Sequence, residues 1–440
     1  MVHPQFSKGG KIMFRKSLVL LSILLFLLTI GFGKTLQFWA TPFVSQPEKF
    51  FEPLVKQFKA ETGIDVEISV VSYADAVTKI QAAIAAGEAP DLVALSEGRF
   101  MPLVRFGNAL YELDEFVTDD LLKRVVRPQL LDQYRQIAGG KLYVFPICFW
   151  TYLGAINLDI FKKAGVPEEF IEKMTDPNKY YTWDDLLQLG AMVTKDYNGD
   201  GKVDHWLYAY PGGENWVHPF LLWYWNAGGS PTLLDENGKP AFNTEATIRA
   251  LKFLLTLKEK GYMPPGVESL SAGDAIDMFT SGKTAFINNV WPSNAFVVWP
   301  KQFKNLNFRL VYPPVGPTGL RTTYFGSYLL AIPRQSKMKR EAWKFIEFLL
   351  RPESQKYISA NTYYSSITGD VPDEFKGDPR VKMYMEVVKY AIPEPMHPAM
   401  ARWKMIYNSE TQAVLSGQKT PEEAAKTMQK LAEQALEFYK

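Results

Sequence analysis

The sequence predicts an α/β protein whose sheets are mostly parallel. Residues 35–95 alternate strand and helix patterns in the order βαβαβ. Strand and helix patterns mix again between residues 207 and 289, and the C-terminal part of the chain is largely helical. Alternating strands and helices give a parallel sheet with helices on its faces. At 440 residues, the chain is long enough for two or more domains.

The individual elements follow from the spacing of apolar residues. Residues 35–40 form a short apolar run typical of a strand, and the next segment places Phe51, Leu54, Val55 and Phe58 at helical spacing. Further strands are predicted at residues 64–71, 89–95, 207–210 and 283–289. Further helices are predicted at residues 73–88, 219–229, 244–261, 272–283, 339–359 and 420–439.

The N-terminus predicts export. Residues 13–33 contain basic Arg15 and Lys16, an apolar run over residues 18–30, and a final Gly33. This pattern is typical of a secretory signal peptide cleaved after Gly33. An uncleaved membrane anchor is the alternative, although the apolar run is short for a membrane span. Residues 1–12 are interpreted as a leader outside the fold. We expect a periplasmic or extracellular protein, secreted through a cleaved signal peptide.

Charge and cysteine content limit the class of partner and the source of stability. Residues 1–33 carry four basic residues and no acid, which leaves 45 basic and 47 acidic residues in the rest of the chain. This balance argues against nucleic acid as a partner, because proteins that bind nucleic acid usually present a basic face. Cys148 is the only cysteine, so stability cannot come from an internal disulfide. A monomer is expected.

The stretch "DYNGDGKVD" resembles the first part of a calcium-binding loop. Asp196, Asn198 and Asp200 occupy positions 1, 3 and 5, a glycine follows, Lys202 would offer its carbonyl, and Asp204 is at position 9. The twelfth residue is a leucine in place of the usual bidentate glutamate, and a strand rather than a helix is predicted to follow. The stretch therefore predicts a structural calcium clip. An Asp-Gly turn without metal is the alternative.

Five segments in order resemble one known family. They are "GEAPDLVAL", "YVFPICFWTYLGAINLDIFKKAGV", "YTWDDLLQLGAMV", "MFTSGKTAFINNVW" and "REAWKFIEFLLRPESQKYIS". They resemble the extracellular solute-binding proteins of ABC sugar transporters, the group that includes maltose-binding protein. The resemblance covers nearly the whole chain after residue 33. It implies that the protein binds a carbohydrate, which we expect to be an oligosaccharide. It also implies that the protein delivers this ligand to an ABC transporter membrane permease and catalyses no reaction.

The resemblance also implies a periplasmic binding protein type II fold, with two lobes joined by a hinge. Lobe one is expected to be residues 34–145 plus 314–352, and lobe two residues 146–313 plus 353–440. The chain would cross between the lobes near Pro146, near residues 312–314 and near Pro352.

A carbohydrate site needs aromatic planes for the apolar ring faces and polar groups for the hydroxyls. The aromatic candidates are Trp39, Trp150, Trp216, Trp291, Tyr324 and Trp403. The polar candidates are Glu97, Arg99, His218 and Arg402. The resemblance supports Arg99, Trp291 and Trp403, whereas Trp39 is chosen because it ends a strand and Trp150 because it lies near a crossing. Core packing and surface ion pairs are the alternatives. Gly98 stands where the family commonly has an acidic sugar ligand, which leaves the substrate open.

Two other functions compete with transport. An exported carbohydrate-active enzyme, a hydrolase or lyase, would need two carboxylates facing each other across the bond. Glu97, Glu214 and Glu394 are the nearest options, and the sequence does not place them together. A calcium-stabilised adhesin would be expected to show β-rich repeats, which this alternating pattern lacks. A cleft rich in tryptophan and poor in acids favours an oligosaccharide or a substituted sugar.

Overall fold

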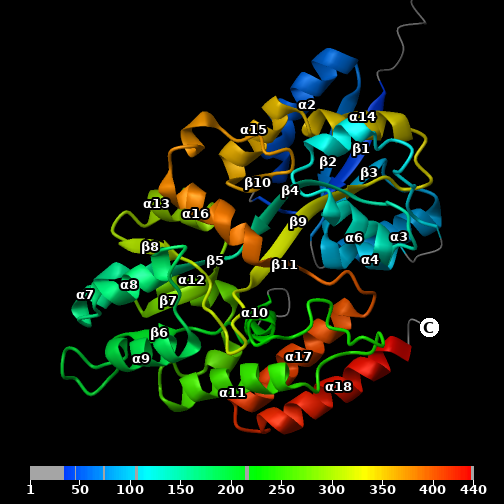
Figure 1. Cartoon of the computed structure of the whole chain (residues 1–440). Helices are drawn as coiled ribbons and strands as arrows, with labels where there is room; N and C mark the ends of the chain where they lie inside the picture. Colours follow the sequence, from blue (N-terminus) through cyan, green and yellow to red (C-terminus); the bar gives the residue numbers. More distant parts are fainter. Residues whose placement is uncertain (1–33, 45, 73–74, 105–107, 214–217, 438–440) are drawn as a thin grey trace, which may run out of the picture.

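The computed structural model describes residues 34–437 except residues 45, 73–74, 105–107 and 214–217. The expected leader and signal peptide, residues 1–33, lie outside the described residues. Two sheets organise the chain (Figure 1). The larger, seven-stranded sheet has the order β10-β4-β9-β3-β1-β2, and β11 pairs with β9. Its strands are β1 (Thr35–Ala40), β2 (Asp65–Val70), β3 (Leu92–Ser96), β4 (Phe145–Thr151), β9 (Thr323–Ala331), β10 (Ser365–Ser366) and β11 (Ala391–Pro393).

The first three strands confirm the predicted βαβαβ unit. Strand β1 pairs in parallel with β2 and with β3, and helices α2 (Pro47–Thr62) and α3 (Ala76–Ala86) connect them. Helix α2 ends where Gly63 adopts φ +72°, a left-handed conformation that glycine enters without steric cost. The prediction of mostly parallel pairing fails beyond this unit, since β9 runs antiparallel to both β3 and β4.

The second sheet has four strands in the order β6-β7-β5-β8. They are β5 (Leu153–Asn157), β6 (Trp206–Tyr208), β7 (Thr284–Val290) and β8 (Phe308–Val311). Helices α9 (Trp183–Val193), α10 (Pro219–Asn226), α11 (Glu245–Glu259), α17 (Met400–Leu415) and α18 (Pro421–Glu437) pack in this half. In Figure 1 these helices fill the lower half of the molecule, away from α2 and α14 (Lys339–Leu349) at the top. The two halves are the two lobes that the sequence predicted.

The other helices are short. They are α4 (Glu97–Val104), α5 (Asp119–Arg124), α6 (Gln129–Ile137), α7 (Leu158–Lys163), α8 (Glu168–Thr175), α12 (Ala272–Thr280), α13 (Trp299–Gln302), α15 (Pro352–Thr362) and α16 (Pro379–Val387). The single helix predicted over residues 339–359 is two helices, α14 and α15. The break falls before Pro352, because proline begins a helix readily but cannot continue one. Within the described part of the chain, no helix is both long and apolar enough to cross a membrane.

The first crossing between the lobes lies later in the chain than expected, whereas the second falls in an interval that includes the expected residues 312–314. Strand β4 pairs with β9 from Phe145 to Thr151, so Pro146 belongs to the first sheet. The chain passes to the second lobe at Tyr152, between β4 and β5, and it returns between Val311 and Thr323. Pro146 marks a shift in strand register, a position at which a sheet tolerates proline.

The third crossing shows the largest difference from the expected division. Strand β10 pairs with β4 and β11 pairs with β9, so the chain from α15 to Pro393 stays with the first lobe. The chain reaches the second lobe only between Pro393 and the start of α17. The expected boundaries, 34–145 plus 314–352 and 146–313 plus 353–440, therefore do not match the sheet pairing.

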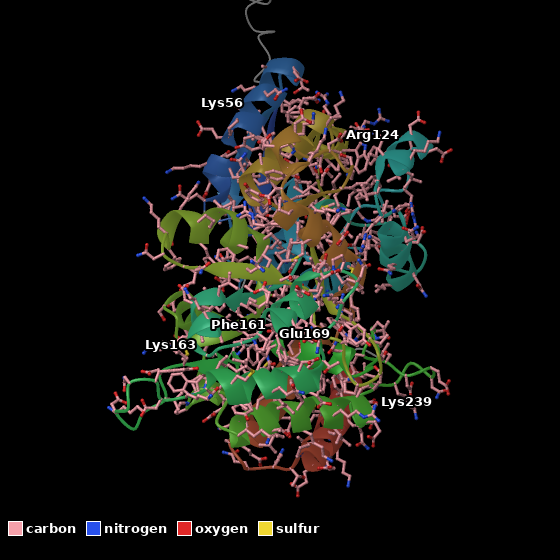
Figure 2. All side chains as sticks on the ribbon, turned by 60° about the vertical axis from the view of Figure 1, so that its left-hand side comes forward. Lys56, Arg124, Phe161, Lys163, Glu169 and Lys239 are labelled. Atoms are coloured by element: carbon pink, nitrogen blue, oxygen red, sulfur yellow. The ribbon has the colours of Figure 1, made fainter. Side chains whose placement is uncertain are left out.

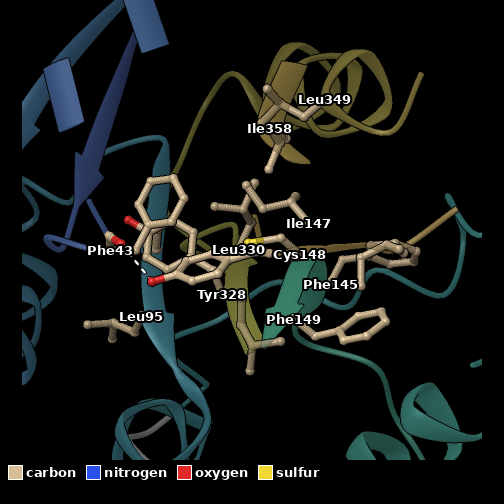
Figure 3. Close-up of a cluster of buried hydrophobic side chains, with 14 of the residues drawn as sticks. Phe43, Leu95, Phe145, Ile147, Cys148, Phe149, Tyr328, Leu330, Leu349 and Ile358 are labelled. Atoms are coloured by element: carbon tan, nitrogen blue, oxygen red, sulfur yellow. Dashed lines mark hydrogen bonds between the residues drawn. The ribbon is translucent and has the colours of Figure 1, made fainter. Parts of the chain in front are cut away.

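Buried aromatic and aliphatic side chains fill the first lobe around β4 and β9. Phe43 stacks on Tyr328 with ring centroids 4.2 Å apart, and the Tyr328 hydroxyl donates to the Thr41 carbonyl at 2.7 Å (Figure 3). Cys148 is a buried free thiol in the same cluster. The charged side chains of Lys56 and Lys239, by contrast, project from the surfaces of the first and second lobes (Figure 2).

A buried glutamine holds α15 to the first lobe. The Gln355 side-chain nitrogen donates to the carbonyls of Ile147 (2.9 Å) and Leu349 (2.8 Å). Its oxygen accepts from the Ser366 hydroxyl and the Ile367 amide, both at 2.9 Å. Both N–H groups and both oxygen lone pairs of this amide are thus used, although the side chain is fully buried.

We predict that Gln355→Met lowers the free energy of unfolding by about 3 kcal/mol or more, because each partner left without a hydrogen bond costs about 1–3 kcal/mol. Urea unfolding followed by circular dichroism measures this change. The same substitution at exposed Gln418 should change the free energy by no more than about 0.5 kcal/mol. Equal effects at the two positions would contradict the anchoring role of Gln355.

Candidate ligand-binding site

A cavity of about 460 Å³ lies between the two lobes. This volume is within the range of small-molecule sites, roughly 300–1,000 Å³. Its lining residues come from both lobes and from the first crossing: Pro42, Ser96, Arg99, Trp150, Tyr152, His218, Trp291, Tyr324, Glu394 and Lys404. Ser96 ends β3 and Arg99 follows it, which is where α/β sheets place their ligand sites.

One side of the cavity is aromatic. Trp150 of the first lobe stacks on Trp291 of the second lobe, with ring centroids 5.9 Å apart and 17° between the planes. Tyr152 stacks on Tyr324 at 4.9 Å. Gly326 makes room for the Trp150 ring, because a Cβ at this glycine would lie 2.6 Å from the indole. Together these rings give the cavity an apolar wall, in which Trp291 is partly exposed and Trp150, Tyr152 and Tyr324 are almost fully buried.

A cluster of charged residues adjoins these rings at Tyr324. The Lys404 ammonium nitrogen lies 2.5 Å from Oε1 of Glu394, and His218 Nε2 lies 3.6 Å from Oε2. The Tyr324 hydroxyl donates to the same Oε2 at 3.2 Å. The side chains of Glu394 and His218 are 2% and 3% exposed, so this cluster is almost sealed from water.

Burial and charge fix the protonation of this cluster. Burial alone would raise the pKa of Glu394, but the positive charge of Lys404 and the facing His218 ring lower it to about 2. Burial, reinforced by the Lys404 charge, lowers the pKa of His218 to about 3. Burial also lowers the pKa of Lys404. At neutral pH, Glu394 is therefore a carboxylate and His218 is a neutral ring.

Five of the ten predicted ligand-binding residues line the cavity: Arg99, Trp150, His218, Trp291 and Tyr324. The sequence reasoning missed Tyr152 and Lys404 and considered Glu394 only as a possible catalytic acid. Glu394 follows the three-residue strand β11, which is too short to give a periodic pattern. Trp216 lies outside the described residues.

Trp403 and Arg402 were expected at the site but do not line the cavity. Trp403 is fully buried in the second lobe, where its ring stacks on His397 at 4.3 Å and its Nε1 donates to the Ala432 carbonyl. Arg402 lies on the exposed side of α17. Successive helical residues point about 100° apart, so Lys404, the residue after Trp403, faces the cavity instead.

Trp39 and Glu97 also lie off the cavity. Trp39 is partly buried and packs against the first-lobe core. Glu97 is fully buried at the start of α4 and bonds to the Ser327 hydroxyl, which in turn lies 2.8 Å from the Tyr134 hydroxyl. Burial raises the pKa of Glu97 to about 8, despite the hydrogen bond from Ser327. Glu97 is thus a protonated acid beneath the site.

The predicted calcium loop connects α9 to β6. Oδ1 of Asp196 accepts from the Gly199 amide at 2.6 Å, and Oδ2 accepts from the Gly201 amide at 2.7 Å. Both glycines have positive φ, 78° and 84°, as the predicted turn requires. These backbone donors, the Gly201 amide foremost, lower the pKa of Asp196. Asn198 and Asp200 each accept from the amide two residues ahead.

The loop offers only oxygen ligands, which suits calcium, but it is incomplete. Asp204 accepts from the Tyr197 amide and from the Asn198 side chain, and it lies 4.0 Å from the Lys163 ammonium. Leu207, at position 12, is buried in β6. Over the described residues, no group of three or more His, Cys, Asp or Glu side chains is placed to hold a metal ion.

The fold agrees with comparisons with known proteins. Residues 44–356 match the family model of the bacterial extracellular solute-binding proteins. The chain belongs to this family, so it is a solute-binding protein of a kind that works outside the cytoplasmic membrane.

Relatives cover most of the chain at low identity. A maltooligosaccharide ABC transporter solute-binding lipoprotein of Streptococcus pneumoniae is 25% identical over 392 residues, covering 86% of this chain and 84% of the relative. The arabinooligosaccharide-binding protein of Bacillus subtilis is 24% identical over 325 residues, covering 72% and 69%. The GacH receptor of Streptomyces glaucescens has a TM-score of 0.76 at 22% identity and covers 93% of this chain and 100% of that chain. This structural likeness confirms the two-lobed fold.

We predict that Glu97→Gln stabilises the protein increasingly as pH rises from about 4.5 to about 8. In this window the native carboxyl keeps its proton and the unfolded one loses it, so wild-type stability falls relative to the variant by at most about 1.4 kcal/mol per pH unit. Urea unfolding at pH 4.5, 6 and 8 measures the difference. Exposed Glu353→Gln is the control, and it should show no such trend. A pH-independent difference for Glu97→Gln would contradict a protonated Glu97.

Proposed function

We propose that the protein binds an oligosaccharide between its lobes, outside the cytoplasmic membrane, and delivers it to an ABC transporter permease. The main support is the cavity itself, which combines stacked aromatic rings with a buried charged cluster. Aromatic planes suit the apolar faces of sugar rings, and polar groups suit their hydroxyls. The relatives named for maltooligosaccharides and arabinooligosaccharides support the same ligand class.

The carboxyl groups at and near this cavity favour binding without catalysis. Glycoside hydrolysis uses two carboxyl groups roughly 5–9.5 Å apart across the bond. Glu394 is the only carboxylate among the described lining residues, and it is paired with Lys404. Glu97 lies buried outside the cavity. The chain would act as a monomer, secreted through a cleaved signal peptide at residues 13–33, and its lobes would close on the ligand.

We further propose a structural calcium ion in the loop of residues 196–204. Asp196, Asn198, Asp200, the Lys202 carbonyl and Asp204 would hold it. The turn geometry with two positive-φ glycines supports this role. An incomplete ligand set gives weak affinity, which calcium concentrations outside cells can satisfy.

For the ligand, we predict that maltotriose or arabinotriose binds the wild-type protein in isothermal titration calorimetry. Trp291→Ala should then weaken binding by about tenfold or more, because a stacked ring contributes more than 1.4 kcal/mol through burial and aromatic contact. Trp206→Ala is the matched control, since Trp206 lies in β6 and does not line the cavity.

The control should leave the affinity within about twofold of wild type. Equal losses in both variants would argue that tryptophan removal acts through stability. Release of hydrolysed sugar during the titration, detected by mass spectrometry, would favour the enzyme alternative.

For the metal, we predict that chelation with EDTA lowers the melting temperature and that adding calcium restores it, while sugar affinity persists. Asp196→Asn should remove this response, because position 1 of the loop would lose its charge. Differential scanning calorimetry measures both. A melting temperature that is the same with and without chelator would leave the loop as a metal-free turn.

A further inference from the structure

Glu394 lies where the chain leaves the first lobe for the last time. It directly follows β11, whose three residues pair with residues 323–325 of β9. Its backbone amide also donates to the Phe325 carbonyl at 3.4 Å. The first-lobe sheet therefore fixes the backbone of Glu394 at the cavity wall, and the side chain is almost fully buried there.

The Glu394 carboxylate has partners in both lobes. Tyr324 donates to it from β9 of the first lobe. Lys404 approaches from α17 and His218 from the residue before α10, both in the second lobe. Glu386 and Lys389 precede Glu394 on α16 and the turn after it, but neither lines the cavity. A single carboxylate thus joins the two lobes at the ligand cavity.

The space for this carboxylate comes from a glycine. A Cβ on Gly98 would lie 2.3 Å from Oε1 of Glu394 and 2.8 Å from its carboxyl carbon. Gly98 does not have a positive φ, so its backbone would accept another residue. Glycine at position 98 is therefore needed for space, because the Glu394 carboxylate occupies the place of a side chain there.

We propose that Glu394 is a positioning and specificity-determining residue, whose pairing with Lys404 and His218 couples ligand binding to closure of the lobes. This inference rests on the proposed function. When the lobes separate, Lys404 and Glu394 return to water, which offsets most of the attraction that they gain in the closed molecule. A near balance of this kind lets a ligand in the cavity decide which state prevails. Glu394 also fixes the direction in which Lys404 and His218 present themselves to the ligand.

The first test uses maltotriose and arabinotriose as probes in calorimetry. Glu394→Gln keeps the size of the side chain and removes its charge, and it should weaken binding by about tenfold or more. Lys404→Met should do the same. The double variant should bind the sugar at most about threefold more weakly than the single variant with the lower affinity, because each substitution removes the same interaction.

The matched control is Glu410→Gln. Glu410 is also buried on α17 and pairs with Lys419 at 2.6 Å, but it does not line the cavity. This variant should lose stability and keep its affinity within about twofold. Full additivity of Glu394→Gln and Lys404→Met, or wild-type affinity in Glu394→Gln, would overturn the proposal.

A second variant reaches the same contact without changing any charge. Gly98→Ala should displace the carboxylate and weaken binding, although alanine favours a helix more than glycine does. Combining it with the shorter acid, Glu394→Asp, should recover part of the lost affinity. A Gly98→Ala protein that folds and binds like wild type would count against the proposal.

A distance measurement separates failure of this inference from failure of the proposed function. Spin labels at Lys56→Cys and Lys239→Cys report the separation of the lobes, since these exposed residues lie on opposite lobes (Figure 2). The measurement is made without ligand and with each sugar. A smaller short-distance population in Glu394→Gln than in wild type, in any condition, supports the proposal. Identical distributions in all conditions overturn it. A wild type that neither binds nor responds to any sugar counts against the proposed function alone.

Discussion

The site depends on one strand, β9, and on its antiparallel pairing with β3 and β4. All nine of its residues are buried. In sequence, it contributes Tyr324 to the cavity, Gly326 as space for the Trp150 ring, Ser327 as partner of Glu97, and Tyr328 as partner of Thr41. Because alternate residues of a strand face opposite sides, each of these roles is fixed once the register is fixed. A slip of one residue would move every one of these groups to the wrong face.

The same strand explains why polar groups are stable at the centre of the molecule. Two buried acids lie near β9, and they differ in charge because their neighbours differ. Glu97 has hydroxyl neighbours and keeps its proton, whereas Glu394 faces Lys404 and ionises. Replacing one member of a buried ion pair is costly, because the other charge stays in a medium of low polarity. The charged side of the cavity is therefore a single unit with fixed protonation near neutral pH, and a neutral, hydroxyl-rich ligand meets the same pattern of donors and acceptors across that range.

Local patterns predicted much of the fold, and long-range contacts account for what they missed. The βαβαβ unit follows from apolar periodicity within short segments, and Trp291 and Arg99 follow from local motifs. The first and third crossings were misplaced because Pro146 and Pro352 were interpreted as hinge residues, whereas one lies at a strand irregularity and the other begins a helix. Trp403 was assigned to the ligand site because it matches a motif, but its position on α17 directs its side chain into the core. The third crossing is fixed by the pairing of β10 and β11 with distant strands, which no local pattern encodes.

The glycine at position 98 has a physical role in the fold. From the sequence alone, a glycine at this position meant a missing acid and an open question about the ligand. In the fold, the Glu394 carboxylate occupies the space that a side chain at residue 98 would take. An acid delivered from the last crossing differs in one respect from an acid on α4: its residue is held by the first-lobe sheet directly before the chain crosses to the second lobe. The charge at the cavity wall therefore lies at the connection between the lobes and contacts partners from both of them.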